Sequence, residues 1–165
     1  RGAAKIYAID VGQDELHTSL RNHPLVVVMD RTNARQLQKL PEPPDLVTID
    51  VSFISLDFIL PAVKMWFEGR AGDIIALVKP QFEAGKEEIQ RHKGVIRDKK
   101  IHARVLEHVM RQSQALGFQI AGLIASPITG SDGNAEFLLW LRLGRDEENI
   151  AIQDAIARVI PPETD

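Results

Sequence analysis

The sequence contains no cysteine, and this absence excludes several kinds of chemistry at once. Without cysteine there is no disulfide framework, no thiolate metal site and no cysteine nucleophile. The composition fits a reducing compartment, and we therefore expect a cytoplasmic protein.

Long apolar runs are missing as well. Stretches such as residues 74–78 are far shorter than the roughly 20 residues that a membrane-spanning helix requires, and no signal peptide is visible. We expect a soluble protein that does not bind a membrane.

Positive charge is not in excess, because 20 Lys and Arg stand against 23 Asp and Glu, a formal net charge of −3. A domain that binds nucleic acid through a broad basic surface needs many cations to displace phosphate counterions. Any contact with RNA must therefore be local or assisted. The five histidines have no spacing that places two of them on one face beside a carboxylate, so we predict no metal site.

At 165 residues, 44% of them apolar, the chain is long enough for one domain with a single buried core. We assign residues 1–145 to this domain. Residues 146–165 carry apolar residues at roughly helical spacing, and we assign them to a C-terminal helix and tail.

Four short apolar runs each end at a polar residue, and runs of this length indicate buried strands. They are residues 5–9, 25–29, 46–49 and 74–78, followed by Asp10, Asp30, Asp50 and Lys79.

Segments with helical spacing separate or follow these strands. The strongest is 98–116, where apolar residues recur every fourth position before Gly117. The others are 14–21, 33–40 and 55–67, the last with Ser55 as N-cap and Pro61 as an expected kink. Strands that alternate with helices imply parallel pairing through right-handed crossovers, and hence a three-layer α/β sheet.

The pattern changes after Gly117. Residues 119–125 and 136–143 are two strand-like runs with no helix between them, so they should pair antiparallel. The predicted fold is therefore α/β and Rossmann-like, a mostly parallel sheet with an antiparallel last strand. This is the arrangement of S-adenosylmethionine-dependent methyltransferases.

Ligands of open α/β sheets bind beyond the carboxyl ends of the strands, so the polar residues at those ends should line one edge. Asp10 could accept hydrogen bonds from both ribose hydroxyls of a nucleoside cofactor. It could equally start a turn or cap the next helix. Spacing alone leaves both roles open.

Asp50, Lys79 and Glu136 each stand at the end or start of a predicted buried strand. A lysine between two carboxylates in a partly desolvated cleft can exchange a proton with a substrate hydroxyl while the carboxylates orient its ammonium. A structural ion-pair network would use the same residues, and spacing alone favours that network.

Longer stretches resemble one known family. They are 45–56 (DLVTIDVSFISL), 77–83 (LVKPQFE) and 126–141 (SPITGSDGNAEFLLWL), and 1–12 and 29–35 match the same family. The resemblance is to the TlyA (haemolysin A) family of S-adenosylmethionine-dependent ribosomal RNA 2'-O-methyltransferases, whose catalytic domain is similar to the FtsJ (RrmJ-like) ribose methyltransferases. Three long, ordered matches are far more specific than any short motif.

The resemblance implies a Lys-Asp-Lys-Glu tetrad, three members of which match Asp50, Lys79 and Glu136. Lys79 would help to remove the proton from a ribose 2'-hydroxyl as that oxygen attacks the methyl group, and the two carboxylates would hold and tune it. The resemblance also implies that S-adenosylmethionine binds with its ribose on Asp10 and its adenine along Val11.

Asn33, with Ala34 beside it, falls where such enzymes read the adenine amino group. Its alternative role is a helix N-cap, which is compatible with facing a ligand. The implied partner is ribosomal RNA or a ribosomal subunit.

The family's glycine-rich turn, the first lysine of the tetrad and a small S4-type RNA-binding domain would all lie upstream of this sequence. We therefore expect a sheet lacking its first strand, which is central in this fold. The strand at 5–9 would then pair directly with the strand at 46–49, borrow a strand from a second copy, or leave residues 1–40 displaced or loosely held. We expect this chain alone to bind S-adenosylmethionine weakly or not at all and to be inactive by itself.

Residues 86–100 are rich in lysine and arginine and contain two glycines when Gly85 is counted with Gly94. This segment is either an RNA-contacting loop or an ordinary solvated charged loop, and the sequence leaves both open.

Two other functions compete with methyl transfer. A membrane-active haemolysin needs an amphipathic or spanning segment with a large exposed apolar face, and the sequence shows none. A non-catalytic interaction module would keep the fold without needing Lys79.

Overall fold

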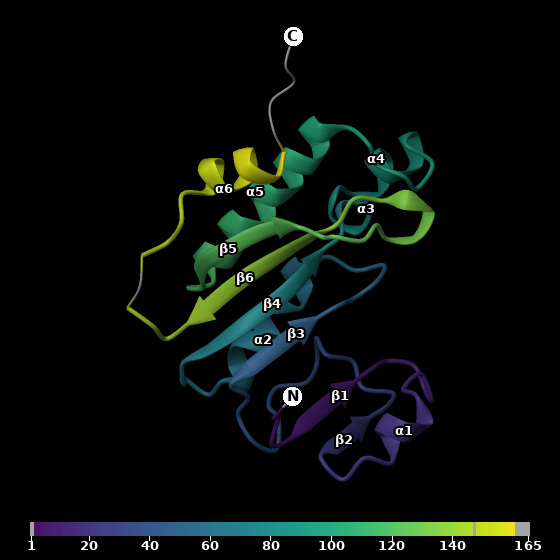
Figure 1. Cartoon of the computed structure of the whole chain (residues 1–165), viewed down its shortest axis with the longest axis vertical. Coiled ribbons are helices and arrows are strands. Elements are labelled where there is room, and N and C mark those ends of the chain that lie inside the picture. The colour runs from purple at the N-terminus through teal and green to yellow at the C-terminus, as the bar shows by residue number, and fades with distance from the viewer. Residues whose placement is uncertain (1, 147, 161–165) are drawn as a thin grey trace.

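The computed structural model describes residues 2–146 and 148–160, which form two separate sheets (Figure 1). The first holds the parallel strands β1 (Ile6–Ile9) and β2 (Val26–Met29). The second has the order β3-β4-β6-β5, in which β3 and β4 are parallel and β6 is antiparallel to both its neighbours. Its strands are β3 (Leu46–Ile49), β4 (Gly72–Val78), β5 (Gln119–Ala125) and β6 (Phe137–Leu143). The predicted α/β fold with an antiparallel last strand is confirmed.

The register of the larger sheet brings the ends of β3 and β4 and the start of β6 to one edge. Ile49 pairs with Ala76 across β3 and β4, and Val78 pairs with Phe137 across β4 and β6. Asp50 and Lys79 directly follow two of these strands and Glu136 directly precedes the third. All three residues therefore lie at the same edge of the sheet.

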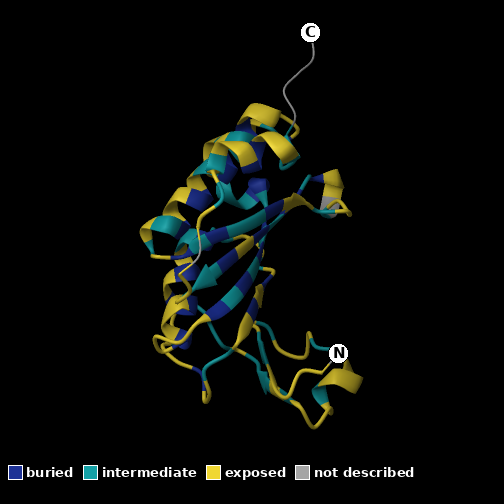
Figure 2. Ribbon diagram, turned by 60° about the vertical axis from the view of Figure 1, so that its left-hand side comes forward, coloured by how far each residue is buried: buried dark blue, intermediate teal, exposed yellow. Residues whose placement is uncertain are grey.

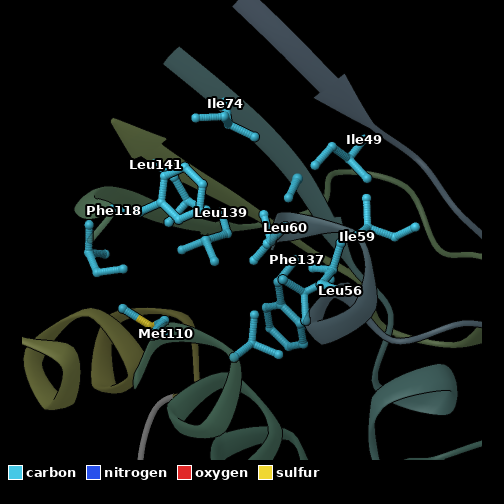
Figure 3. Close-up of a cluster of buried hydrophobic side chains, with 14 of the residues drawn as sticks. Ile49, Leu56, Ile59, Leu60, Ile74, Met110, Phe118, Phe137, Leu139 and Leu141 are labelled. Carbon is cyan, nitrogen blue, oxygen red and sulfur yellow. The ribbon is translucent and has the colours of Figure 1, made fainter. Parts of the chain in front are cut away.

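Helices cover one face of the larger sheet (Figure 2). They are α2 (Leu60–Trp66), α5 (Lys99–Ala115) and α6 (Ile152–Val159), and their buried residues join those of the strands in one core (Figure 3). Every second residue of β4 is buried, while Ile75 and Leu77 between them stay partly exposed. The described part of the chain places no helix over that second face, so the expected third layer is not seen there.

Helix α5 follows its sequence pattern closely. The side chain of Asp98 caps it by accepting from the Lys100 N–H at 2.8 Å, and Gly117 follows it with φ of 86°. The predicted C-terminal helix is present as α6, and residues 161–165 of the predicted tail lie outside the described residues.

Two predicted helices are wrong. The segment 14–21 forms only α1 (Thr18–Arg21), because Asp14 has φ of 62°, which a helix does not accommodate. The segment 33–40 forms a turn instead. Its Leu37 carbonyl accepts a hydrogen bond from Trp66 Nε1 at 2.6 Å, and Leu40 precedes a proline, which disfavours helical backbone.

The expected helix at 55–67 divides in two. Ser55 caps a 3-10 turn, η1 (Leu56–Phe58), by accepting from the Asp57 N–H at 3.1 Å. A new helix, α2, then begins, and Pro61 falls in its first turn. Proline is tolerated there because that N–H has no intrahelical partner, so Pro61 begins a helix rather than kinking one.

Residues 2–40 contribute little to the main core, since only Leu40 is buried in it while side chains such as Tyr7, Ile9 and Met29 pack against it partly buried. β1 and β3 do not pair, and Leu40 is the first buried residue of the described chain. The direct pairing of the strand at 5–9 with the strand at 46–49 is therefore not seen, and β1 and β2 are set apart from β3 (Figure 1).

Candidate functional site

A cleft of about 1460 Å³ lies along the loops that leave both sheets. Its wall includes the loops after β1 and β2, the loop after β3 and the turn that follows β4. The predicted cofactor and catalytic residues that line it are Asp10, Val11, Asn33, Ala34 and Asp50. The sequence placed Asp10 and Asp50 at strand ends, and the fold brings both to one cavity, whereas Lys79 and Glu136 are not among the residues that line it.

Lys79 contacts this cleft through Asp50, which is part of its wall. Its Nζ lies 2.6 Å from Asp50 Oδ1 and donates to Ser52 Oγ at 3.2 Å. The same ammonium lies 5.8 Å from the centroid of the Phe82 ring. Only 13% of the Lys79 side chain is exposed, against 72% for Asp50, so a largely buried cation is held by a carboxylate that reaches the cleft.

Glu136 is buried, and its partner is an amide rather than the lysine. Its Oε1 accepts from Gln81 Nε2 at 3.1 Å, and no ion pair joins it to Lys79 in the described part of the chain. Glycine at position 130 leaves room for this carboxylate, since a Cβ there would lie 2.1 Å from Glu136 Oε1 and the side chain of Glu136 would have to shift. The structure therefore pairs Asp50 with Lys79, while Glu136, at the same edge of the sheet, pairs with Gln81 instead.

Of the two roles that spacing left open for Asp10, the structure shows the turn. Asp10 Oδ1 accepts from the Gly12 N–H at 2.7 Å, which closes a turn, and its backbone carbonyl accepts from the Thr32 N–H at 2.8 Å. Its Oδ2 has no hydrogen-bond partner among the described residues and can accept from a ligand in the cleft.

Asn33 is not a helix N-cap, because no helix follows it. Its Oδ1 accepts from the Arg35 N–H at 3.1 Å and closes a turn at the cleft wall. Ala34 lies beside it in the same wall, and 70% of Val11 is exposed as an apolar surface.

Glu83 is a site residue that sequence reasoning did not single out. Its Oε1 accepts from the Leu56 N–H at 2.9 Å, which joins helix α3 (Pro80–Glu83) to the end of the loop that carries Asp50. Burial raises the pKa of the Glu83 carboxyl, and the charge of Asp57 raises it further, against the lowering effect of hydrogen bonds from Ser55 and Leu56. Glu83 lies within the 77–83 stretch, but only the folded chain shows its contact with Leu56.

Phe53 is a second site residue that the sequence did not indicate. It is 90% exposed in the cleft wall, its φ is 62°, and its ring centroid lies 4.9 Å from that of Phe82. An exposed aromatic ring in strained backbone is uncommon outside functional sites.

In the described part of the chain, no helix is long and apolar enough to cross a membrane. The same residues contain no group of three or more His, Asp or Glu placed to hold a metal ion.

Comparison with known proteins supports the resemblance seen in the sequence. The family model of the FtsJ-like methyltransferases matches residues 1–143. The chain is 46% identical over 164 residues to the 16S/23S rRNA (cytidine-2'-O)-methyltransferase TlyA of Mycobacterium tuberculosis, covering 97% of this chain and 60% of that protein. It is 34% identical over 147 residues to hemolysin A of Brachyspira hyodysenteriae, covering 83% of this chain and 58% of that one.

A solved structure of a candidate hemolysin from Lactococcus lactis superposes with a TM-score of 0.84 at 41% identity, covering 95% of this chain and 77% of that one. The chain spans about 60% of the length of the curated relatives it matches. Both the methyltransferase and the hemolysin names occur within one family, and that family implies a methyl donor. The chain belongs to the FtsJ-like methyltransferase family.

Proposed function

We propose that the protein containing this chain transfers a methyl group from S-adenosylmethionine to a ribose 2'-hydroxyl of ribosomal RNA. The observation that carries the proposal is the largely buried Lys79 ammonium, held 2.6 Å from Asp50 while Asp50, Ser52 and Phe82 line a cleft of about 1460 Å³. The name of the Mycobacterium tuberculosis relative assigns that protein cytidine 2'-O-methylation of 16S and 23S rRNA.

Lys79 would act on the hydroxyl of the substrate. Its positive charge favours the ionised form of a hydroxyl beside it, and the neutral amine can accept the proton that leaves. Asp50 and Ser52 fix the direction of the Nζ. Glu136, oriented by Gln81, supplies a second carboxylate at the same edge, where it adds to the negative potential around the lysine.

The cleft residues fit S-adenosylmethionine. The open Oδ2 of Asp10 can accept from a ribose hydroxyl, and the exposed side chain of Val11 offers an apolar surface to a planar base. Asn33 and Ala34 would flank the same base. When bound, the cofactor supplies an electrophilic methyl group.

Ribosomal RNA as substrate places the protein with the ribosome, and hence in the cytoplasm. The hemolysin name of some relatives suggests a membrane-active protein instead, but methyl transfer has the Lys79 arrangement in its favour. A non-catalytic role would leave that arrangement without a use, and substitution of the lysine separates the two.

The test is Lys79→Ala and Lys79→Arg in the full-length protein, measured as 2'-O-methylation of ribosomal RNA. We expect the rate to fall by at least ~100-fold in Lys79→Ala, the lower end of general acid–base contributions. Lys79→Arg should also be slow, since arginine keeps the charge but does not deprotonate. S-adenosylmethionine affinity should stay unchanged.

Lys39→Ala is the matched control, because Lys39 is an exposed lysine away from the cleft. A Lys79→Ala variant with the methylation rate of this control would exclude the proposed role of Lys79. Membrane leakage by the wild-type protein without methyl transfer would exclude the proposed function.

A further inference from the structure

Exposed cations gather between helix α4 (Lys86–Arg91) and the first turn of α5. We call this surface the basic shelf, and it consists of Lys86, Lys93, Arg97, Lys99 and Lys100. None of the five has an ion-pair partner within residues 2–146 and 148–160. The nearby Glu88 is already engaged by Arg91 at 3.4 Å and by Arg104 at 2.7 Å.

Hydrogen bonds hold the backbone of the shelf to the rest of the site. Asn134, only 3% exposed, accepts from the Ile96 N–H at 3.1 Å and donates to the Gly94 carbonyl at 3.2 Å. Ile96 is itself buried, and its carbonyl lies 2.9 Å from His102 Nε2. Asn134 stands two residues before Glu136, so the backbone of the shelf is fastened to the loop that carries a candidate catalytic carboxylate.

Two cations of the shelf lie where they destabilise the fold. Lys99 and Lys100 occupy the first turn of α5, where the helix dipole is positive, and apart from the N-cap Asp98 no acidic residue balances them there. Residues 86–100 carry six Lys and Arg against three Asp and Glu, although the chain as a whole has a net charge of −3. Cations at the positive end of a helix are unfavourable by themselves, and a bound anion would offset their repulsion. Such an arrangement is expected where a surface serves binding.

We propose that the basic shelf binds the phosphate backbone of the RNA strand that enters the cleft. This rests on the proposed function, which makes RNA the substrate. Lys86, Ile89 and Gly94 line the cleft, so the shelf begins at its rim and continues outward to the start of α5. Figure 1 shows α4 on the same side of the molecule as the loop between β5 and β6. Binding to phosphate positions a strand without reading its sequence, and it would hold the target ribose near Lys79.

The test compares two double variants of the full-length protein that remove equal charge. Lys99→Gln with Lys100→Gln alters the shelf, and Lys39→Gln with Arg158→Gln alters exposed residues elsewhere. Binding of a ribosomal RNA fragment is measured across a range of salt concentrations. We expect the slope of log affinity against log salt to fall by about 0.7 to 0.9 for each phosphate that is no longer neutralised, and hence by up to about 2 in the shelf variant.

Methylation by the shelf variant should show a KM for RNA raised about tenfold or more, with kcat and S-adenosylmethionine affinity unchanged. Its melting temperature should be equal to or above that of the wild type, because the substitution relieves the charge at the helix start. A misfolded variant would show the opposite shift.

A shelf variant with the salt slope and KM of the control would overturn the proposal while leaving methyl transfer by Lys79 intact. Weakened binding to anionic phospholipid vesicles with unchanged RNA affinity would also overturn it, in favour of a lipid surface. Absence of any RNA binding by the wild type would defeat both proposals together.

Discussion

Glu83 holds its carboxyl in a half-buried position, where the Leu56 N–H donates to one of its oxygens at 2.9 Å. Burial raises the pKa of this carboxyl above the ordinary value of 4.5. A raised pKa means that folding favours the protonated form. The resulting contribution to stability is complete below the ordinary pKa and is lost as pH rises through the raised pKa of the folded state.

We expect Glu83→Gln to remove this pH dependence, because the amide keeps an oxygen for the Leu56 N–H and has no proton to lose. The free energy of unfolding should fall more steeply in the wild type than in the variant as pH rises from about 4.5 towards 7. Urea unfolding across that range measures it.

Glu88→Gln provides a control of opposite sign, because the Arg104 guanidinium lowers the pKa of Glu88. For Glu88 the effect lies below the ordinary pKa of 4.5. The wild type should gain stability over Glu88→Gln as pH rises through the lowered pKa of Glu88. Parallel pH profiles of the wild type and Glu83→Gln would show that burial does not control the ionisation of Glu83.

At the scale of elements, strands were predictable and short helices were not. All six strands lie within two residues of the apolar runs that predicted them, because buried strands need continuous apolar residues. α5 was predictable from its periodicity and from Gly117. The turn at 33–40 depends on the Trp66 contact with Leu37, which joins residues 29 positions apart and leaves no local pattern.

The same division holds for the site. Asp50 and Lys79 could be placed together because parallel strands end at one edge, and the 2.6 Å pair follows from that. The partner of Glu136 could not be predicted, since its hydrogen bond to Gln81 spans 55 positions and both side chains are buried. Sequence spacing sets which edge a residue occupies, whereas packing decides its partner.

In the loop between β5 and β6, Gly130 has no side chain and so leaves space for the carboxylate of Glu136. We expect Gly130→Ala to displace the Glu136 carboxylate, because the new Cβ would lie 2.1 Å from its Oε1. The proposed methyl transfer should then slow by up to about 100-fold, the loss that a misplacement of about 1 Å can cause.

Gly122→Ala is the control, since a Cβ there meets the Trp140 ring at an ordinary 3.6 Å. Both variants should stay folded by circular dichroism, and only the first should lose activity. Full methylation activity of Gly130→Ala would mean that the position of Glu136 does not matter to the reaction.

At the scale of the whole molecule, the site is assembled from two unequal halves. Asp10, Val11, Asn33 and Ala34 come from the small β1-β2 unit, while the catalytic candidates belong to the four-stranded sheet with its helical layer. Within its described residues the small unit carries no buried residue before Leu40, and the apolar side chains that it packs against the core, such as Tyr7, Ile9 and Met29, are only partly buried. Cofactor binding and catalysis thus depend on parts of very different stability.

Local unfolding should follow this division. We expect the amide hydrogens of β1 and β2 to exchange through opening of the small unit alone, because that opening breaks one pair of strands and uncovers only partly buried apolar side chains. The amides of β4 and β6 should exchange only on global unfolding, since Ile74, Leu139 and Leu141 are fully buried between the sheet and the helices. Hydrogen exchange followed by mass spectrometry on peptides covering 5–30, 72–78 and 137–143 measures both. Protection in the first peptide should fall short of that in the other two by orders of magnitude and should respond little to low concentrations of denaturant. Equal protection in all three would mean that the two sheets open as one cooperative unit, so that the cleft between them is held as firmly as the core.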